Sequence, residues 1–122
     1  MSQLNEFSSF PQKASSVIGS NVVNPKGESL GDIKEIVIDP RTGKVAYVVV
    51  AFGGFFSMGE KLFAIPFSAF DFNVPNKEYV LDVSKERLEA APGFDADKWP
   101  MMSDEKWNRD VHKYFERSPY WE

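Results

Sequence analysis

Cysteine is absent from this 122-residue chain, and histidine occurs only once. Without thiols the chain has no disulfide framework, no thiolate nucleophile and no sulfur-ligated metal site. The single histidine, His112, lacks a cysteine or an activated serine with which it could form a nucleophilic constellation. Asp110 is close to it in sequence but falls on a different face of the expected helix. We therefore interpret His112 as a surface or helix-flank residue and expect no catalytic residues and no enzyme.

Carboxylates are present, but they do not follow the spacing of a known metal-binding loop. Four carboxylates lie in one expected strand and the turns beside it: Glu28, Asp32, Glu35 and Asp39. Solvated charge explains them better than a metal site. We therefore expect neither a metal nor a cofactor.

A phosphate-binding loop is also missing, although Gly54 and Gly59 have the spacing of one. Glu60 stands where that motif needs lysine, and Lys61 stands where it needs serine or threonine. The segment also leads into an expected strand instead of a helix. We therefore interpret residues 53–59 as a wide hairpin loop.

Charge and hydropathy exclude further classes of protein. The formal net charge is −4 and no run of Lys or Arg interrupts it, which argues against binding to nucleic acid. The longest apolar run, residues 45–52, is far shorter than the roughly 20 residues of a membrane-spanning helix. The first sixteen residues lack the basic and apolar regions of a signal peptide, so we expect a cytoplasmic protein without a membrane span.

Three zones are expected along the chain, which has the length of one domain. Residues 1–15 are polar and rich in serine, which indicates a mobile N-terminal arm, although Phe7 and Phe10 could dock. Residues 16–100 form the main domain, in which short β-branched and aromatic segments alternate with turn residues up to residue 83. Residues 101–122 form a C-terminal helical extension packed on that domain.

The stretch over residues 30–66, LGDIKEIVIDPRTGKVAYVVVAFGGFFSMGEKLFAIP, predicts three successive strands. In its first strand, over residues 29–38, the apolar positions change phase, so a bulge near Lys34 and Glu35 would let Ile33, Ile36 and Ile38 face one core.

Turns separate these strands. Residues 24–27, Asn-Pro-Lys-Gly, form one turn, and residues 39–43 form a second that we expect to close with Gly43 in the left-handed conformation. Residues 45–52 are apolar on both faces, which predicts one face on the interior and the other against a helix or a second subunit.

The second half begins with three further strands, over residues 61–65, 68–72 and 77–83, with Pro66 after the first of them. Ser84 is expected to cap a short helix that ends before Pro92. Ser103 is expected to cap a longer helix over residues 104–117. Four residues of that helix share one face that should lie against the sheet: Trp107, Val111, Tyr114 and Phe115.

The order and spacing of these segments closely resemble the PRC-barrel family. The resemblance covers residues 14–100 and includes Val17-Ile18-Gly19 as a short strand, LDVSKERL at residues 81–88 and APGF at residues 91–94. It implies a mainly β protein, a small PRC-type β-barrel with short C-terminal helices. The family includes the cytoplasmic domain of the photosynthetic reaction centre H subunit and the C-terminal domain of a ribosome maturation factor. The transmembrane helix of the first and the RNA-binding domain of the second are not seen in this chain.

The resemblance carries over no catalytic residue and implies binding to other macromolecules. We interpret the chain as a non-enzymatic protein-interaction or assembly module for a protein partner of unknown identity, associated with photosynthetic or electron-transfer complexes or with stress response. The alternatives are a ligand-binding barrel and an RNA- or ribosome-associated assembly factor.

The expected interaction surface lies at the end of one strand and in the loop that follows it. It consists of Phe52, Phe55, Phe56 and Met58, because so small a barrel cannot enclose all of its phenylalanines. A two-fold homodimer would cover such a cluster. The alternative is that the N-terminal arm or the C-terminal segment, with Tyr120 and Trp121, covers these rings within one chain.

Overall fold

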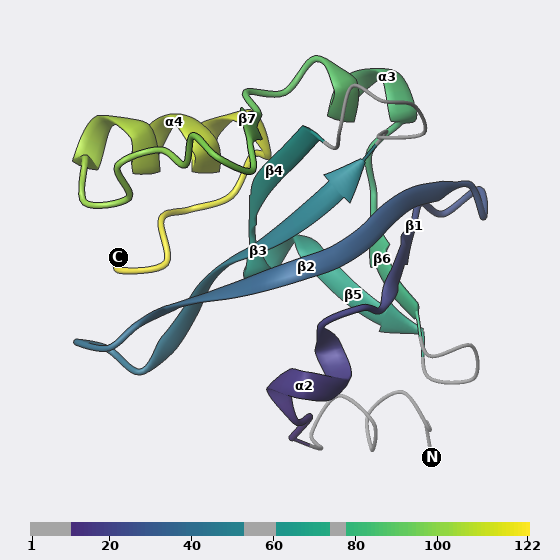
Figure 1. Cartoon of the computed structure of the whole chain (residues 1–122), viewed down its shortest axis with the longest axis horizontal. Coiled ribbons are helices and arrows are strands. Elements are labelled where there is room, and N and C mark those ends of the chain that lie inside the picture. Colours follow the sequence, from purple (N-terminus) through teal and green to yellow (C-terminus); the bar gives the residue numbers. More distant parts are fainter. Residues whose placement is uncertain (1–10, 53–60, 74–77) are drawn as a thin grey trace.

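The computed structural model describes residues 11–52, 61–73 and 78–122. Its strands are β1 (Asn21–Val23), β2 (Ser29–Asp39), β3 (Lys44–Phe52), β4 (Lys61–Pro66), β5 (Phe70–Asn73), β6 (Glu78–Leu81) and β7 (Phe94–Asp95). Its helices are α2 (Ala14–Val17), α3 (Lys85–Glu89), α4 (Glu105–Tyr114) and the 3-10 turn η1 (Phe67–Ala69). Figure 1 shows α4 beside β4, and α2 at the opposite end of the molecule.

The strands form one seven-stranded sheet in the order β5-β6-β1-β2-β3-β4-β7. All neighbours are antiparallel except β1 and β6, which run parallel. The mainly β architecture is therefore confirmed. Among the described residues, these ladders make a row with β5 and β7 at its ends, and closure into a barrel stays a prediction.

The two turns predicted between the first three strands of the chain are present. The Asn24 side-chain oxygen accepts hydrogen bonds from the backbone N–H groups of Lys26 and Glu28, at 3.1 and 3.0 Å, which closes the turn between β1 and β2. Gly43 has a φ of +74° and closes the turn between β2 and β3 as predicted. The short strand expected at Val17-Ile18-Gly19 is wrong, because Val17 ends helix α2.

The predicted bulge in β2 is confirmed, with a register shift between Ile33 and Glu35. The expectation that Ile38 faces the core together with Ile33 was wrong, because Ile33 is buried whereas Ile38 is 56% exposed. A second register shift separates Val37 from Ile38, close to the end of the β2–β3 hairpin, which projects beyond the rest of the sheet in Figure 1. Ile38 therefore lies at the edge of the apolar interior and not within it.

Strand β3 is covered on both faces, as predicted, since its residues from Ala46 to Ala51 are all buried. Val48 and Val50 belong to the main core, whereas Val49 and Ala51 form a second small cluster with Leu62.

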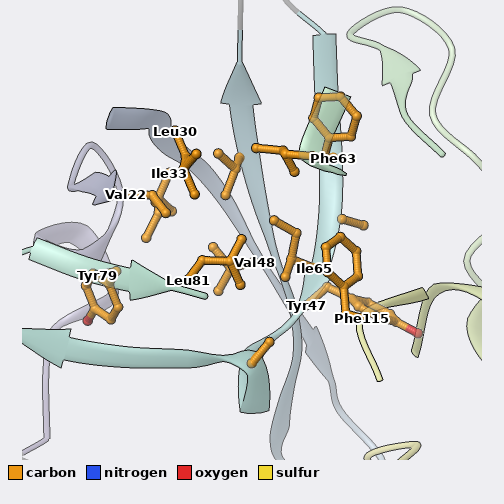
Figure 2. Packing of buried hydrophobic residues seen from close by; sticks show 14 of the residues in the cluster. Val22, Leu30, Ile33, Tyr47, Val48, Phe63, Ile65, Tyr79, Leu81 and Phe115 are labelled. Carbon is orange, nitrogen blue, oxygen red and sulfur yellow. The ribbon is translucent and has the colours of Figure 1, made fainter. Parts of the chain in front are cut away.

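The main core draws side chains from strands on both sides of β3. Figure 2 shows Leu81 of β6, Val48 of β3 and Ile65 of β4 converging in it, and each is at most 1% exposed. Side chains from several strands of the sheet therefore pack against one another in a filled core.

The helical half also follows the predicted pattern, but the longer helix runs from Glu105 to Tyr114 and not over residues 104–117, and its cap differs. Ser84 caps α3 and accepts a hydrogen bond from the Arg87 backbone N–H. Helix α4 is capped by Asp104 and not by Ser103, because the Asp104 side chain accepts from the Lys106 N–H. Val111 and Phe115 on the predicted face are buried in the main core.

Helix α4 is the longest helix in the described ranges, with ten residues. Within those ranges no helix has both the length and the apolar content needed to cross a bilayer.

Candidate functional site

The interaction surface expected from the sequence falls largely outside the described residues. Phe55, Phe56 and Met58 lie in residues 53–60, so their expected exposure stays a prediction. Phe52 is described and is partly buried, with its ring centroid 6.5 Å from that of Phe63 in the core. Phe52 therefore serves at least in part as a core-packing residue.

A different apolar surface emerges from the fold. A groove of about 540 Å³ opens between helix α2, the β2–β3 hairpin, η1 and the β5–β6 pair. The residues lining this apolar groove are Pro11, Gln12, Ala14, Val17, Ile36, Ile38, Val45, Val48, Phe67, Phe70, Asp71, Phe72 and Tyr79. In Figure 1, α2 lies at the bottom of the molecule, below the sheet and between the β2–β3 hairpin on the left and β5 on the right.

The floor and the rim of the apolar groove differ in exposure. Val17, Val48 and Tyr79 are buried and form its floor, whereas Ile38 is 56% and Phe67 is 40% exposed at its rim. Large apolar side chains gathered around a concavity are the usual mark of a binding surface, in contrast to isolated exposed ones.

Local chain geometry explains why these side chains meet. Pro66 ends β4, and the 3-10 turn that follows buries Ala69 and leaves Phe67 outward. Phe70, Asp71 and Phe72 of β5 all line the groove, and the two phenylalanines share one face of the strand because they are two residues apart. The Tyr79 ring lies across from them, with centroids 6.4 Å from Phe70 and 4.6 Å from Phe72.

The electrostatics of the apolar groove favour uncharged groups. Asp71 is the only charged residue among the described residues that line it. Burial raises the pKa of Tyr79, so its hydroxyl stays neutral at physiological pH. An aliphatic or aromatic side chain would therefore meet mainly hydrocarbon here.

A second cluster lies at the far end of the hairpin, where the C-terminal segment, residues 118–122, packs on the fold. The Tyr120 hydroxyl donates a hydrogen bond of 2.6 Å to Asp39, and Lys44 Nζ donates to the Tyr120 carbonyl oxygen at 3.1 Å. Arg109 binds Glu122 at 3.1 Å and lies over the ring of Trp121. The C-terminal segment therefore contacts both the hairpin and helix α4 through polar side chains.

Asp39 is the most strongly perturbed carboxyl group in this cluster. Hydrogen bonds from the Arg41 side chain, the Tyr120 hydroxyl and the Arg41 backbone N–H lower its pKa to about 2. The two partners fix its carboxylate at the end of β2. Asp39 is therefore a structural anchor for the turn and for the C-terminal segment.

His112 corrects the sequence interpretation, because it is buried and only 1% exposed. Its Nδ1 lies 2.8 Å from the backbone oxygen of Asn108, so Nδ1 is the donor, and Nε2 has no hydrogen-bond partner among the described residues. The rings of Tyr47 and Trp121 lie at centroid distances of 5.4 Å. The three-dimensional packing of residues 118–122 buries this histidine, which a helix-periodicity pattern alone does not reveal.

The other acidic candidates do not come together. Glu28 accepts a hydrogen bond of 2.8 Å from the Asn24 amide, and Asp32 and Glu35 are exposed on β2. Over the described ranges, no group of three histidine or carboxylate side chains is placed to hold a metal ion.

The sequence contained a partial signal for the apolar groove. The phase change between Ile33 and Ile36 and the alternation of Phe70, Asp71 and Phe72 are visible in it. That these residues meet helix α2 depends on the parallel β1–β6 pairing, which joins residues 57 positions apart at Val22 and Tyr79. No local pattern predicts such a pairing.

Comparison with known proteins shows which domain family and which relative the chain resembles. Residues 12–88, more than half of the chain, match the family model described as the PRC-barrel domain. A stretch of 79 residues is 28% identical to an uncharacterized protein of Deinococcus radiodurans. This match covers 61% of the chain but 29% of that protein, so the chain spans less than a third of the relative's length.

Proposed function

The chain belongs to the PRC-barrel domain family, and on that basis we propose that it is a non-enzymatic interaction module whose apolar groove binds an apolar segment of a partner protein. The observation that carries this proposal is the exposure of Ile38 and Phe67 at the rim of a groove of about 540 Å³. Fully burying an exposed side chain of this size is worth roughly 1.5 to 3 kcal/mol, and covering the exposed parts of Ile38 and Phe67 would contribute a fraction of that for each. Two such side chains could anchor a segment of a few residues.

The location of the groove supports a peptide segment over a small molecule held inside the sheet. The interior around Leu30, Ile65 and Leu81 is filled by side chains that are at most 1% exposed, and none of the three lines the groove. The apolar groove lies outside it and offers few polar groups to orient a small ligand, whereas small-molecule sites usually combine an apolar wall with several placed donors and acceptors.

The placement of His112 supports a role without catalysis. Its ring is enclosed by Tyr47, Tyr120 and Trp121 and is nearly inaccessible to a substrate. Asp71 and Tyr79, the ionisable groups of the apolar groove, have no described nucleophile or base beside them among its lining residues. The described lining of the groove therefore has shape and hydrophobicity but lacks a set of reacting groups.

The charges near the groove also disfavour nucleic acid. Its lining contains one carboxylate and no lysine or arginine in the described part of the chain. Nucleic-acid affinity depends largely on cationic side chains that neutralise phosphates. An RNA- or ribosome-associated role would therefore need a different surface.

Selection of binding peptides from a displayed random library tests the proposal directly. We expect enriched peptides to carry two or more large apolar residues and to bind the full-length protein in a fluorescence titration. Ile38→Glu places a charge on the rim at an already exposed position and should weaken that binding at least tenfold, or about 1.4 kcal/mol. Met101→Glu is the matched control, because Met101 is 74% exposed and does not line the groove.

The contrary outcomes are equally specific. A library that yields no binding peptides would count against the groove as a peptide site, as would peptides that bind the Ile38→Glu variant as well as the wild type. Binding of small apolar compounds without any peptide binding would favour the alternative, a ligand-binding role.

A further inference from the structure

The apolar groove lies where the described part of the chain begins. Pro11 and Gln12, the first two described residues, line it together with Ala14 and Val17 of helix α2. The ten residues that precede Pro11 are therefore tethered at the rim of the groove. Their order along the chain fixes where they start, whatever their conformation.

The sequence of these ten residues matches the chemistry of the groove. MSQLNEFSSF carries its large apolar side chains after the first residue at every third position: Leu4, Phe7 and Phe10. Glu6 is the only charged residue in the segment. Regularly spaced large apolar side chains on a nearly neutral segment are the kind of partner that a groove lined by Ile38, Phe67 and Phe70 would accept.

The reach of the segment is sufficient. A helix rises 1.5 Å per residue and an extended chain spans at most about 3.6 Å per residue, so ten residues cover roughly 15 to 36 Å. Phe10 is covalently next to Pro11 at the rim, and Phe7 is only three residues further away. Neither ring needs to travel across the molecule to reach the groove.

We propose that Phe7 and Phe10 occupy the apolar groove of their own chain and that this segment competes with a partner segment for it. The competition rests on the proposed function, but the occupancy can be tested without it. A short tether gives the segment an effective concentration in the millimolar range. A weak contact is then enough to keep the groove occupied for most of the time.

The expected effect on partner binding follows from that occupancy. If the groove is free in about one molecule in ten, the apparent affinity for a competing peptide is reduced about tenfold. Replacing both phenylalanines by serine in the full chain should restore it. We therefore expect a groove-binding peptide to bind Phe7→Ser, Phe10→Ser about tenfold more tightly than the wild type.

Paramagnetic NMR measures the occupancy itself. The chain has no cysteine, so Ser8→Cys accepts a single nitroxide label. We expect the label to broaden the methyl signals of Ile38 and Val45 far more than those of Leu88 and Val111, and we expect Phe7→Ser, Phe10→Ser to abolish the difference. A label at Asp97, an exposed residue outside the groove, is the control and should leave Ile38 sharp.

Three results would overturn the inference in different ways. Uniform weak broadening would show that the segment does not dock. Broadening between a labelled chain and a separate isotope-enriched chain would show docking on a second copy. Unchanged peptide affinity in the double variant, with peptide binding still lost in Ile38→Glu, would reject the competition but leave the proposed function standing. No peptide binding in any variant, with broadening intact, would reject the proposed function and the competition that rests on it, but would leave the occupancy of the groove standing.

Discussion

Tyr120 donates a hydrogen bond of 2.6 Å from its hydroxyl to Oδ2 of Asp39, which lies 81 residues earlier in the chain. The bond joins the C-terminal segment to the tip of the β2–β3 hairpin. Asp39 also accepts from the backbone N–H of Arg41 at 2.9 Å, within the hairpin turn. One carboxylate thus stabilises both a local turn and a long-range contact.

The lowered pKa of Asp39 predicts a pH dependence of folding. Because its pKa is about 2 in the folded protein and about 3.9 when unperturbed, the unfolded chain binds the proton more readily between these values. The contribution of Asp39 to stability is therefore complete above about pH 4 and is lost as the pH falls through about 2. Urea denaturation of the wild type and Asp39→Asn from pH 6 to pH 2 gives the free energy of unfolding at each pH. We expect the values of the two proteins to converge as the pH falls toward 2.

Tyr120→Phe provides the matching test of the second partner. Removal of the hydroxyl takes away one of the hydrogen bonds that lower the pKa of Asp39, so that pKa should rise and the acid-induced loss should begin at higher pH. Asp97→Asn, at an exposed carboxyl group, is the control. A carboxyl titration of Asp39 that is identical in the wild type and in Tyr120→Phe would show that this bond is absent in solution.

Two glycines should differ in their tolerance of a side chain. Gly43 has a φ of +74° with open space where a Cβ would stand, so Gly43→Val should cost roughly 1 to 2 kcal/mol through backbone strain alone. Gly31 has a φ of +133°, and an added Cβ would lie 2.1 Å from the backbone oxygen of Ala51. We expect Gly31→Ala to cost more than Gly43→Val in chemical denaturation, since β2 and β3 would have to separate. The reverse order would mean that the β2–β3 pairing differs here.

Helix α4 should contribute to stability through its buried face. Phe115 is 8% exposed in the main core, and truncating a buried phenylalanine to alanine costs roughly 3 kcal/mol. Lys113→Ala, on the exposed side, should stay within about 0.5 kcal/mol of the wild type. Thermal denaturation distinguishes them, and truncation after Pro100 should lower the melting temperature further. A truncated protein as stable as the full chain would show that the helix does not dock.

Self-association through the cluster of Phe52, Phe55, Phe56 and Met58 is a separate prediction. We expect light scattering to detect a homodimer of the wild type and a monomer of the Phe55→Ser, Phe56→Ser double variant, because the double variant removes two apolar rings from the expected interface. A wild type that is monomeric at high micromolar concentration would contradict the dimer. A dimer that survives in the double variant would place the interface on another surface.

Much of the sheet could be predicted because its signals are local. The turn at residues 39–43 contains its own acceptor in Asp39 and its own left-handed residue in Gly43, so the sequence of the turn itself places the hairpin. The apolar face of α4 follows from its period in the same way. The predicted cap of α4 was Ser103 and the observed cap is Asp104. Serine and aspartate are both good N-caps, so only the position of the first helical turn decides between them.

The apolar groove and the burial of His112 could not be predicted, because both depend on contacts between distant segments. Tyr120 and Trp121 cover His112 only after the chain has turned back over helix α4. The groove exists only where α2 meets the hairpin and β5. Its lining residues are ordinary strand residues when each segment is considered alone.

Chemical-shift mapping of a selected apolar peptide on the isotope-enriched full-length protein tests the central claim most directly, namely that the apolar groove is the interaction surface. We predict that the signals of Ile38, Val45 and Phe67 shift on titration, while those of Trp99 and Met101, exposed apolar residues elsewhere, stay in place. Shifts confined to Trp99 and Met101, with Ile38 and Phe67 unmoved, would contradict the account.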